Sequence, residues 1–130
     1  MRAQQLFLAR VTDALEPYGL TFARYELLRL LAFTRAGELP LGKLGVRLQV
    51  HPTSVTNAVD RLELQGLVQR RPHPTDGRAT LAVLTAEGRA RVDAATEALN
   101  AVFVDLGLTA DECDEIIALV RAARTAAGDP

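Results

Sequence analysis

The spacing of apolar residues in the middle of the chain constrains its fold more than any other feature. Leu44 and Leu48 lie one helical turn apart, and a four-residue break at positions 49–52 follows them. Beyond the break, apolar residues recur at the spacing of one helical face, at Val55, Ala58, Val59 and Leu62. Pro52 suits the first turn of a helix, where its missing N–H is no loss. The pattern predicts two short helices joined by a tight turn.

After Gly66 the pattern changes from that of a helix to that of a strand. Gly66 is suited to end a helix in the left-handed conformation. Residues 67–71 and 80–84 are short and compatible with β-structure, and the prolines and the Asp-Gly step of residues 72–77 indicate a turn between them. We expect a two-stranded hairpin with a long tip.

Amphipathic segments flank this unit on its N-terminal side. Apolar residues recur at steps of three and four over positions 6–18, which predicts a helix that ends by Gly19. Thr21 is expected to cap a second, strongly apolar helix that stops near Gly37. Residues 39–41 are expected to be extended.

Two more helices are predicted on the C-terminal side. Thr85 is expected to cap a long fifth helix with an apolar stripe from Val92 to Leu106. Thr109 and Glu112 have the spacing of a capping box for a sixth helix. The fold class is therefore mainly α, a winged helix-turn-helix in the order α-α-β-α-α-β-β-α-α.

Composition limits the setting in which such a chain works. Its 130 residues, 48% of them hydrophobic, suit one compact domain. No apolar run is long enough to span a membrane, and the single cysteine excludes an intramolecular disulfide framework. We expect a cytoplasmic protein without a cofactor or a metal site.

Charge is segregated along the chain although the net charge is only −1. Residues 42–91 carry eight Lys and Arg against four acidic residues, whereas residues 92–130 carry two Arg against eight acidic residues. A basic middle beside an acidic tail fits a surface that meets the phosphates of DNA, and it also fits two ordinary solvated surfaces.

The polar residues of the second short helix favour the first of these interpretations. They are short or medium groups that reach base edges and phosphates in a major groove, namely Thr53, Ser54, Thr56, Asn57 and Arg61. The hairpin adds Arg70, Arg71, His73, Asp76 and Arg78. An arginine at a hairpin tip suits a minor groove. Asp76 either restricts Arg78 by ion pairing or forms a weak surface pair with it.

At these residues the sequence resembles the MarR family of bacterial transcription regulators. The resemblance runs from about Tyr18 to Arg91 and rests on an ordered set of short motifs. These are Leu44 with Leu48, Pro52-Thr53-Ser54-Val55-Thr56, Val59-Asp60-Arg61-Leu62-Glu63, Gly66-Leu67-Val68, Arg70-Arg71, Asp76-Gly77-Arg78, and Leu84-Thr85 with Gly88. Gly45 and Gln49 depart from it, since alanine and glycine are usual there.

The resemblance implies a homodimer on a palindromic operator, modulated by a small ligand or by thiol oxidation. It implies a dimerisation helix at residues 1–20, a DNA-binding lobe at residues 21–85, and a linker with dimerisation helices at residues 86–130. Recognition would fall to the polar residues of the second short helix. Arg78 would be the wing arginine and Asp76 its orienting partner.

Several sharper interpretations compete with plainer ones. Residues 37–43 nearly form a phosphate-binding loop, but Leu44 stands where the magnesium-binding Ser or Thr is required. Cys113 shares a helical face with apolar residues and is expected to pack in the core, not to sense oxidants. His51 and His73 are expected to cap turns or contact phosphate, because two histidines without clustered carboxylates make no metal site.

Aromatic residues of the N-terminal half are candidates for an effector pocket. Phe7, Tyr18, Phe22 and Tyr25, with Phe103, either line such a pocket or fill the core. The leading hypothesis is a DNA-binding repressor. A winged-helix module for protein contacts is the alternative, and its anchors would be exposed Leu, Met or aromatic residues. No catalytic constellation points to an enzyme.

Overall fold

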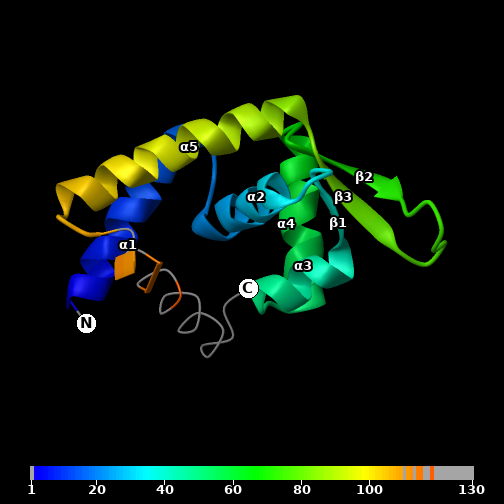
Figure 1. Cartoon of the computed structure of the whole chain (residues 1–130), viewed down its shortest axis with the longest axis horizontal. Helices are drawn as coiled ribbons and strands as arrows, with labels where there is room; N and C mark the ends of the chain where they lie inside the picture. The colour runs from blue at the N-terminus through cyan, green and yellow to red at the C-terminus, as the bar shows by residue number, and fades with distance from the viewer. Residues whose placement is uncertain (1, 110, 113, 116–117, 119–130) are drawn as a thin grey trace.

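The computed structural model describes residues 2–109, 111–112, 114–115 and 118, and it places five α-helices and three strands among them (Figure 1). The helices are α1 (Arg2–Leu15), α2 (Phe22–Phe33), α3 (Leu41–Leu48), α4 (Pro52–Leu64) and α5 (Ala86–Asp105), with a 3-10 turn, η1 (Glu16–Tyr18), after α1. The strands are β1 (Glu38–Pro40), β2 (Val68–Pro72) and β3 (Thr80–Leu84). The predicted winged helix-turn-helix is confirmed.

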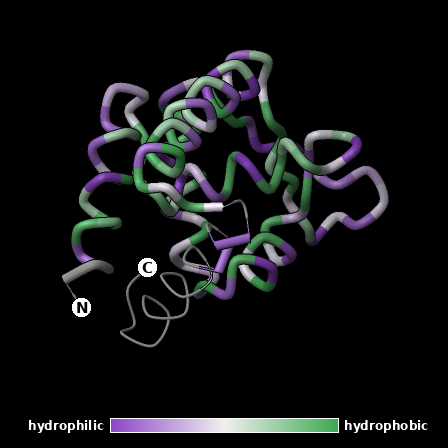
Figure 2. The backbone as a smooth tube through the Cα atoms, turned by 60° about the vertical axis from the view of Figure 1, so that its left-hand side comes forward, coloured by the Kyte–Doolittle hydropathy of each residue, from purple (hydrophilic) through white to green (hydrophobic). Residues whose placement is uncertain are grey.

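The long helix α5 runs from the hairpin at one end of the molecule to α1 at the other (Figure 1). Its buried face packs on α1 and α2, and the stacked rings of Phe7 and Phe103, with centroids 5.7 Å apart, join α1 to α5. Hydrophobic and hydrophilic stretches alternate along the helices (Figure 2), as expected when each helix buries one face. One continuous core therefore connects the terminal helices to the helix-turn-helix.

The helix ends predicted from side chains are confirmed. Thr21 Oγ1 accepts a hydrogen bond from Arg24 N at 3.2 Å, and Thr85 Oγ1 accepts one from Gly88 N at 2.9 Å. Thr109 and Glu112 form both hydrogen bonds of the capping box at 3.2 Å. These bonds satisfy backbone N–H groups that have no partner within a helix.

Two helix boundaries and the strand pairing differ from the sequence-based expectation. Helix α2 ends at Phe33 instead of near Gly37, because Thr34 is extended and bonds back to Leu31 O through both N and Oγ1. Helix α3 begins at Leu41, directly after Pro40, although Leu41 was expected to be extended. The hairpin is not two-stranded alone, since β3 also pairs with β1 in an antiparallel sheet of order β1-β3-β2.

Two glycines near the helix-turn-helix lie where other parts of the chain approach closely. A Cβ on Gly88 would lie 2.1 Å from Leu67 O, which is far inside van der Waals contact. A Cβ on Gly45 would lie 3.3 Å from Val50 O and 3.4 Å from Val55 Cγ2. The low helix propensity of Gly45 is thus offset by the tight packing of α3 on the turn before α4.

Several predictions fall outside the described residues. The core role of Cys113 and most of the predicted sixth helix belong to this group. No helix in the described part of the chain is long and apolar enough to cross a membrane.

Candidate nucleic-acid interface

Helix α4 presents a polar face because its apolar residues turn into the core. Val55, Val59 and Leu62 are buried, with exposures of 2% or less. On the rest of the surface Thr53, Thr56, Asn57 and Arg61 are exposed and Ser54 is half-buried. The structure therefore brings together all five residues that the sequence assigned to this face.

The turn between α3 and α4 fixes where that face begins. Gln49 has φ of 57°, the left-handed conformation that usually calls for glycine. Val50 N then donates to Gly45 O at 3.1 Å, and His51 Nδ1 accepts a hydrogen bond from Thr53 N at 3.1 Å. His51 is thus the N-cap of α4, as expected for a polar cap.

The tip of the hairpin is held by hydrogen bonds of its own side chains to its backbone. His73 Nδ1 accepts from Thr75 N at 3.2 Å and from Asp76 N at 3.0 Å. Asp76 Oδ1 accepts from Arg78 N at 3.0 Å, and Ala79 N donates to Asp76 O at 3.1 Å. The exposed loop that carries Arg78 is therefore ordered by local bonds.

This geometry replaces the expected ion pair between Asp76 and Arg78. The Asp76 carboxylate binds the backbone N–H of Arg78, and the described residues include no ion pair between the two side chains. An aspartate side chain readily accepts a hydrogen bond from the backbone N–H two residues further along the chain, and the Asp76 carboxylate is used in this way. The Arg78 guanidinium is left exposed.

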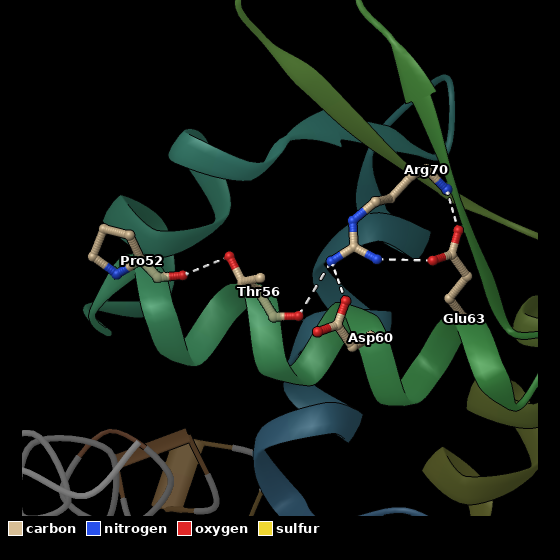
Figure 3. Close-up of polar contacts among 5 residues, drawn as sticks. All are labelled: Pro52, Thr56, Asp60, Glu63 and Arg70. Atoms are coloured by element: carbon tan, nitrogen blue, oxygen red, sulfur yellow. Dashed lines mark hydrogen bonds and ion pairs between the residues drawn. The ribbon is translucent and has the colours of Figure 1, made fainter.

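Arg70 differs from the other predicted DNA-binding residues because its guanidinium is held within the protein. Nη2 lies 2.6 Å from Asp60 Oδ1 and Nη1 lies 2.8 Å from Glu63 Oε1, so β2 is tied to α4 (Figure 3). Burial alone lowers the pKa of Arg70, but hydrogen bonds and charges of Asp60 and Glu63 outweigh it and raise that pKa. In this structure the guanidinium of Arg70 is therefore bound within the protein.

Most cations of the basic segment lack such partners. Of the eight Lys and Arg of residues 42–91, only Arg70 and Arg91 form ion pairs with described residues. The other six are Lys43, Arg47, Arg61, Arg71, Arg78 and Arg89. Arg71 instead donates to Gln69 Oε1 at 3.1 Å on the exposed side of β2. Uncompensated positive charge favours an anionic partner.

Arg24 is a candidate that the sequence analysis missed. It lies in the first turn of α2, and its Nε is buried without a hydrogen-bond partner among the described atoms. Burial and the neighbouring charge of Arg61 lower the pKa of Arg24. A cation in the first turn of a helix opposes the helix dipole, and this unfavourable placement was the available signal.

A cleft of about 780 Å³ lies between α2, α3 and the C-terminal part of α5. Its lining includes three of the aromatic candidates for an effector pocket, namely Phe22, Tyr25 and Phe103. Phe7 and Tyr18 do not line it: Phe7 is buried in its stack with Phe103, and Tyr18 lies in η1 at the end of α1. The assignment of these two residues to an effector pocket stays a prediction, and this cleft does not support it.

Charged groups stand among the apolar walls of the cleft. Two cations, Arg29 and Arg47, and two carboxylates, Glu26 and Asp114, line it. Arg29 Nη1 donates to Tyr25 Oη at 2.7 Å, and Tyr25 Oη lies 2.7 Å from Thr96 Oγ1. The guanidinium of Arg29 also lies over the Phe33 ring, 5.2 Å from its centroid. In the described residues no three His, Cys, Asp or Glu side chains are grouped as a metal site requires.

Comparison with known proteins agrees with this arrangement. A model of the MarR family matches residues 18–79. The crystal structure of Sco5413, a MarR family transcriptional regulator from Streptomyces coelicolor, is 56% identical and superimposes with a TM-score of 0.76 over 100% of this chain and 92% of that one. The chain belongs to the MarR family of transcriptional regulators.

More distant MarR structures share the fold. Sco3205 from Streptomyces coelicolor, solved in complex with DNA, is 27% identical with a TM-score of 0.76, over 94% of this chain and 79% of that one. CouR from Rhodococcus jostii RHA1, bound to p-coumaroyl-CoA, is 27% identical with a TM-score of 0.73, over 99% of this chain and 88% of that one.

Curated relatives, described as uncharacterised HTH-type transcriptional regulators, come from Bacillus subtilis and Mycobacterium leprae. They are 33% to 37% identical, and the matches span 44% to 59% of their own length. Membership of the MarR family agrees with the expectation that the chain is a regulator and not an enzyme. The motifs that carried the resemblance in the sequence, from Leu44 to Gly88, lie on α3, α4, the hairpin and the start of α5.

Proposed function

We propose that this chain is a homodimeric, sequence-specific DNA-binding repressor that acts on a palindromic operator. The observation that carries the proposal is the exposed polar face of α4 beside a hairpin tip whose Arg78 has no ion-pair partner among the described residues. In each protomer α4 enters a major groove while the hairpin reaches the adjacent minor groove. The two half-sites lie about 34–36 Å apart, one turn of DNA.

Contacts divide into those that read bases and those that hold phosphates. Asn57 is the best candidate for a base edge, because its exposed amide both donates and accepts hydrogen bonds. Thr53, Ser54 and Thr56 add hydroxyl groups, although Thr56 Oγ1 already donates to Pro52 O at 3.1 Å. We assign Arg61, Arg71 and His73 to phosphates of the DNA backbone. Arg24, which lies next to Arg61, is assigned to the phosphates as well.

The homodimer is supported by apolar side chains on the terminal helices. Leu6 and Leu8 of α1 are 59% and 38% exposed, and Val104 of α5 is 76% exposed. Isolated exposed apolar residues are common, but these three lie on α1 and α5, which pack together at one end of the molecule. We assign residues 1–20 and 86–130 to dimerisation and residues 21–85 to DNA binding.

Response to a ligand is proposed from the cleft. Its apolar walls suit an aromatic molecule, and Arg29 and Arg47 offer cations to an anionic group on that molecule, beside the carboxylates of Glu26 and Asp114 that also line the cleft. Because the cleft is formed by α2, α3 and α5, a ligand that prefers one arrangement of these helices shifts the spacing of the two α4 helices. CouR, crystallised with p-coumaroyl-CoA, is a relative with such a ligand.

Selection of genomic DNA tests the proposal. Purified protein is incubated with sheared genomic fragments, and the retained fragments are sequenced and assayed by fluorescence anisotropy. A recurrent palindrome bound much more tightly than random duplex is expected. Uniform weak binding to all fragments, together with capture of a protein partner, would favour the protein-interaction module instead.

The ligand response is tested separately. A library of small aromatic acids is screened for a rise in melting temperature, and each hit is added to the protein–operator complex. Saturable binding that weakens DNA affinity is expected for the wild type and not for Arg47→Gln. A library without any saturable binder that changes DNA affinity would count against an effector of this class.

A further inference from the structure

One cluster of charged residues is not accounted for by contacts to DNA. It consists of Asp60 and Glu63 on α4 and Arg70 on β2, and we call it the α4–β2 clamp (Figure 3). DNA repels carboxylates, so two of them on the helix proposed to enter its groove need an explanation. Both bind the same guanidinium, at 2.6 Å and 2.8 Å.

The clamp has two further bonds that make it directional. Glu63 Oε2 accepts a hydrogen bond from the backbone Arg70 N at 3.1 Å, while its other oxygen binds the guanidinium. Arg70 Nη2 also reaches Thr56 O at 3.3 Å, so the side chain spans two turns of α4 (Figure 3). The planar guanidinium fixes both distance and angle, as a lysine ammonium does not.

The clamp bridges the short turn that connects α4 to the hairpin. Three residues, 65–67, separate Leu64 from Val68, and Gly66 among them has φ of 75°. The turn itself is held by hydrogen bonds from Gly66 N to Glu63 O at 3.0 Å and from Leu67 N to Leu62 O at 2.9 Å. The clamp adds contacts beyond this turn that hold β2 against α4. The base of the hairpin is anchored by buried Leu67 and Val68, whereas its outer half projects from the molecule (Figure 1).

Stability alone is a weak reason for the clamp. The Asp60 and Glu63 side chains are 56% and 43% exposed, and exposed ion pairs contribute little to folding. The effect of these ion pairs on geometry is larger, because a small rotation at the base of the hairpin moves its distant tip by several ångströms. Orientation matters most where two elements must meet two grooves at once.

We infer that Asp60, Glu63 and Arg70 are positioning residues that set the angle of the hairpin to α4 for binding to a specific DNA site. This inference rests on the proposed function. It makes Arg70 a residue that acts through the hairpin and not through a phosphate. Loss of either carboxylate then weakens binding to the operator even though it removes a negative charge next to DNA.

The sign of that effect provides the test. Asp60→Asn, Glu63→Gln and the double variant are titrated with operator and with random duplex, and Glu97→Gln on the exposed surface of α5 serves as the matched loss of one carboxylate. The double variant is expected to bind operator about tenfold more weakly, with random duplex unchanged or slightly tighter. Operator binding as tight as, or tighter than, that of Glu97→Gln would overturn the inference.

Arg70 itself distinguishes positioning from a phosphate contact. Arg70→Gln is expected to weaken operator binding without changing the slope of log K against log salt. A slope smaller by about 0.9 would mean one lost phosphate contact and would overturn the inference. Arg70→Lys keeps the charge but not the fork, so it is expected to remain defective, and full recovery in this variant would also contradict the clamp.

A measurement without DNA keeps the inference testable if the proposed function fails. Amide hydrogen exchange is measured on the full chain of wild type and of the double variant. Faster exchange is expected at Arg70 N and along β2, with α5 unchanged and the unfolding temperature close to that of Glu97→Gln. Unchanged exchange in β2 would refute the clamp, whereas failure of the wild type to bind DNA would refute only the proposed function.

Discussion

At the scale of single residues, the structure separates cations that are committed inside the protein from cations that are available to a partner. Arg70 belongs to the first group because Asp60 and Glu63 bind it. Arg78 belongs to the second, and the carboxylate expected to pair with it holds the loop backbone instead. Counting charges in the sequence treats the two arginines alike, although their surroundings give them different roles.

Arg78→Ala is expected to lower DNA affinity and to flatten its dependence on salt. A guanidinium in a minor groove replaces bound counterions, so its loss reduces the slope of log K against log salt by about 0.9. Fluorescence anisotropy at several salt concentrations measures both quantities. Arg10→Ala is the control, since Arg10 pairs with Asp105 at 2.6 Å on the α1 side of the molecule. Identical titrations of Arg78→Ala and wild type would refute the contact.

Arg24→Gln is expected to reduce the salt slope while leaving base preference unchanged. The side chain lies beside Arg61 without a carboxylate partner among the described residues, and a DNA phosphate would neutralise both. Removing the like charge also relieves repulsion, so the melting temperature of the free protein is expected to stay level or rise. A loss of affinity confined to particular base pairs would contradict a phosphate contact.

At the scale of elements, junctions decide the geometry of the interface. The start of α5 packs so closely against the turn after α4 that a Cβ on Gly88 would lie 2.1 Å from Leu67 O. Thr85 reinforces this junction, because its Oγ1 donates to Gly66 O at 2.8 Å. The direction of α5 is thus coupled to the end of α4.

Gly88→Ala is expected to destabilise the protein by about 1–3 kcal/mol, since the methyl group forces α5 away from Leu67. Alanine has the higher helix propensity, so steric overlap must outweigh a gain of about 1 kcal/mol. Urea unfolding followed by circular dichroism gives the difference. Gly42→Ala on α3 is the control, because no atom lies within 4 Å of its added Cβ and a neutral or stabilising effect is expected. Equal stability of the two variants would contradict this account.

At the scale of the whole molecule, the two ends of α5 serve different purposes. One end adjoins the hairpin, and the other packs on α1, where Arg10 Nη2 binds Asp105 Oδ2 at 2.6 Å. Apolar residues left exposed at this second end are the basis for the proposed dimer. In the proposed dimer, α5 therefore connects the proposed subunit contact to the proposed DNA contact.

Val104→Glu is expected to shift the protein from dimer to monomer and to weaken operator binding. The residue is 76% exposed in the single chain, and a buried carboxylate at an interface is costly without a partner. Light scattering coupled to gel filtration measures the mass. Leu64→Glu is the matched control, since Leu64 is 85% exposed on α4 and is expected to leave the mass unchanged. An unchanged mass for Val104→Glu would place the interface elsewhere.

The sequence by itself determined the order of the elements, their caps and the polar face of α4. These features depend on residues within a few positions of one another. The periodicity of helices and strands is local in this sense, and so are the capping hydrogen bonds of Thr21, Thr85 and Thr109. Only the tertiary structure decided that β1 joins the hairpin, that Phe7 and Tyr18 lie outside the cleft, and that Arg70 is held by α4. A long side chain contacts partners that tertiary packing brings near to it, and short-range sequence patterns do not identify such partners.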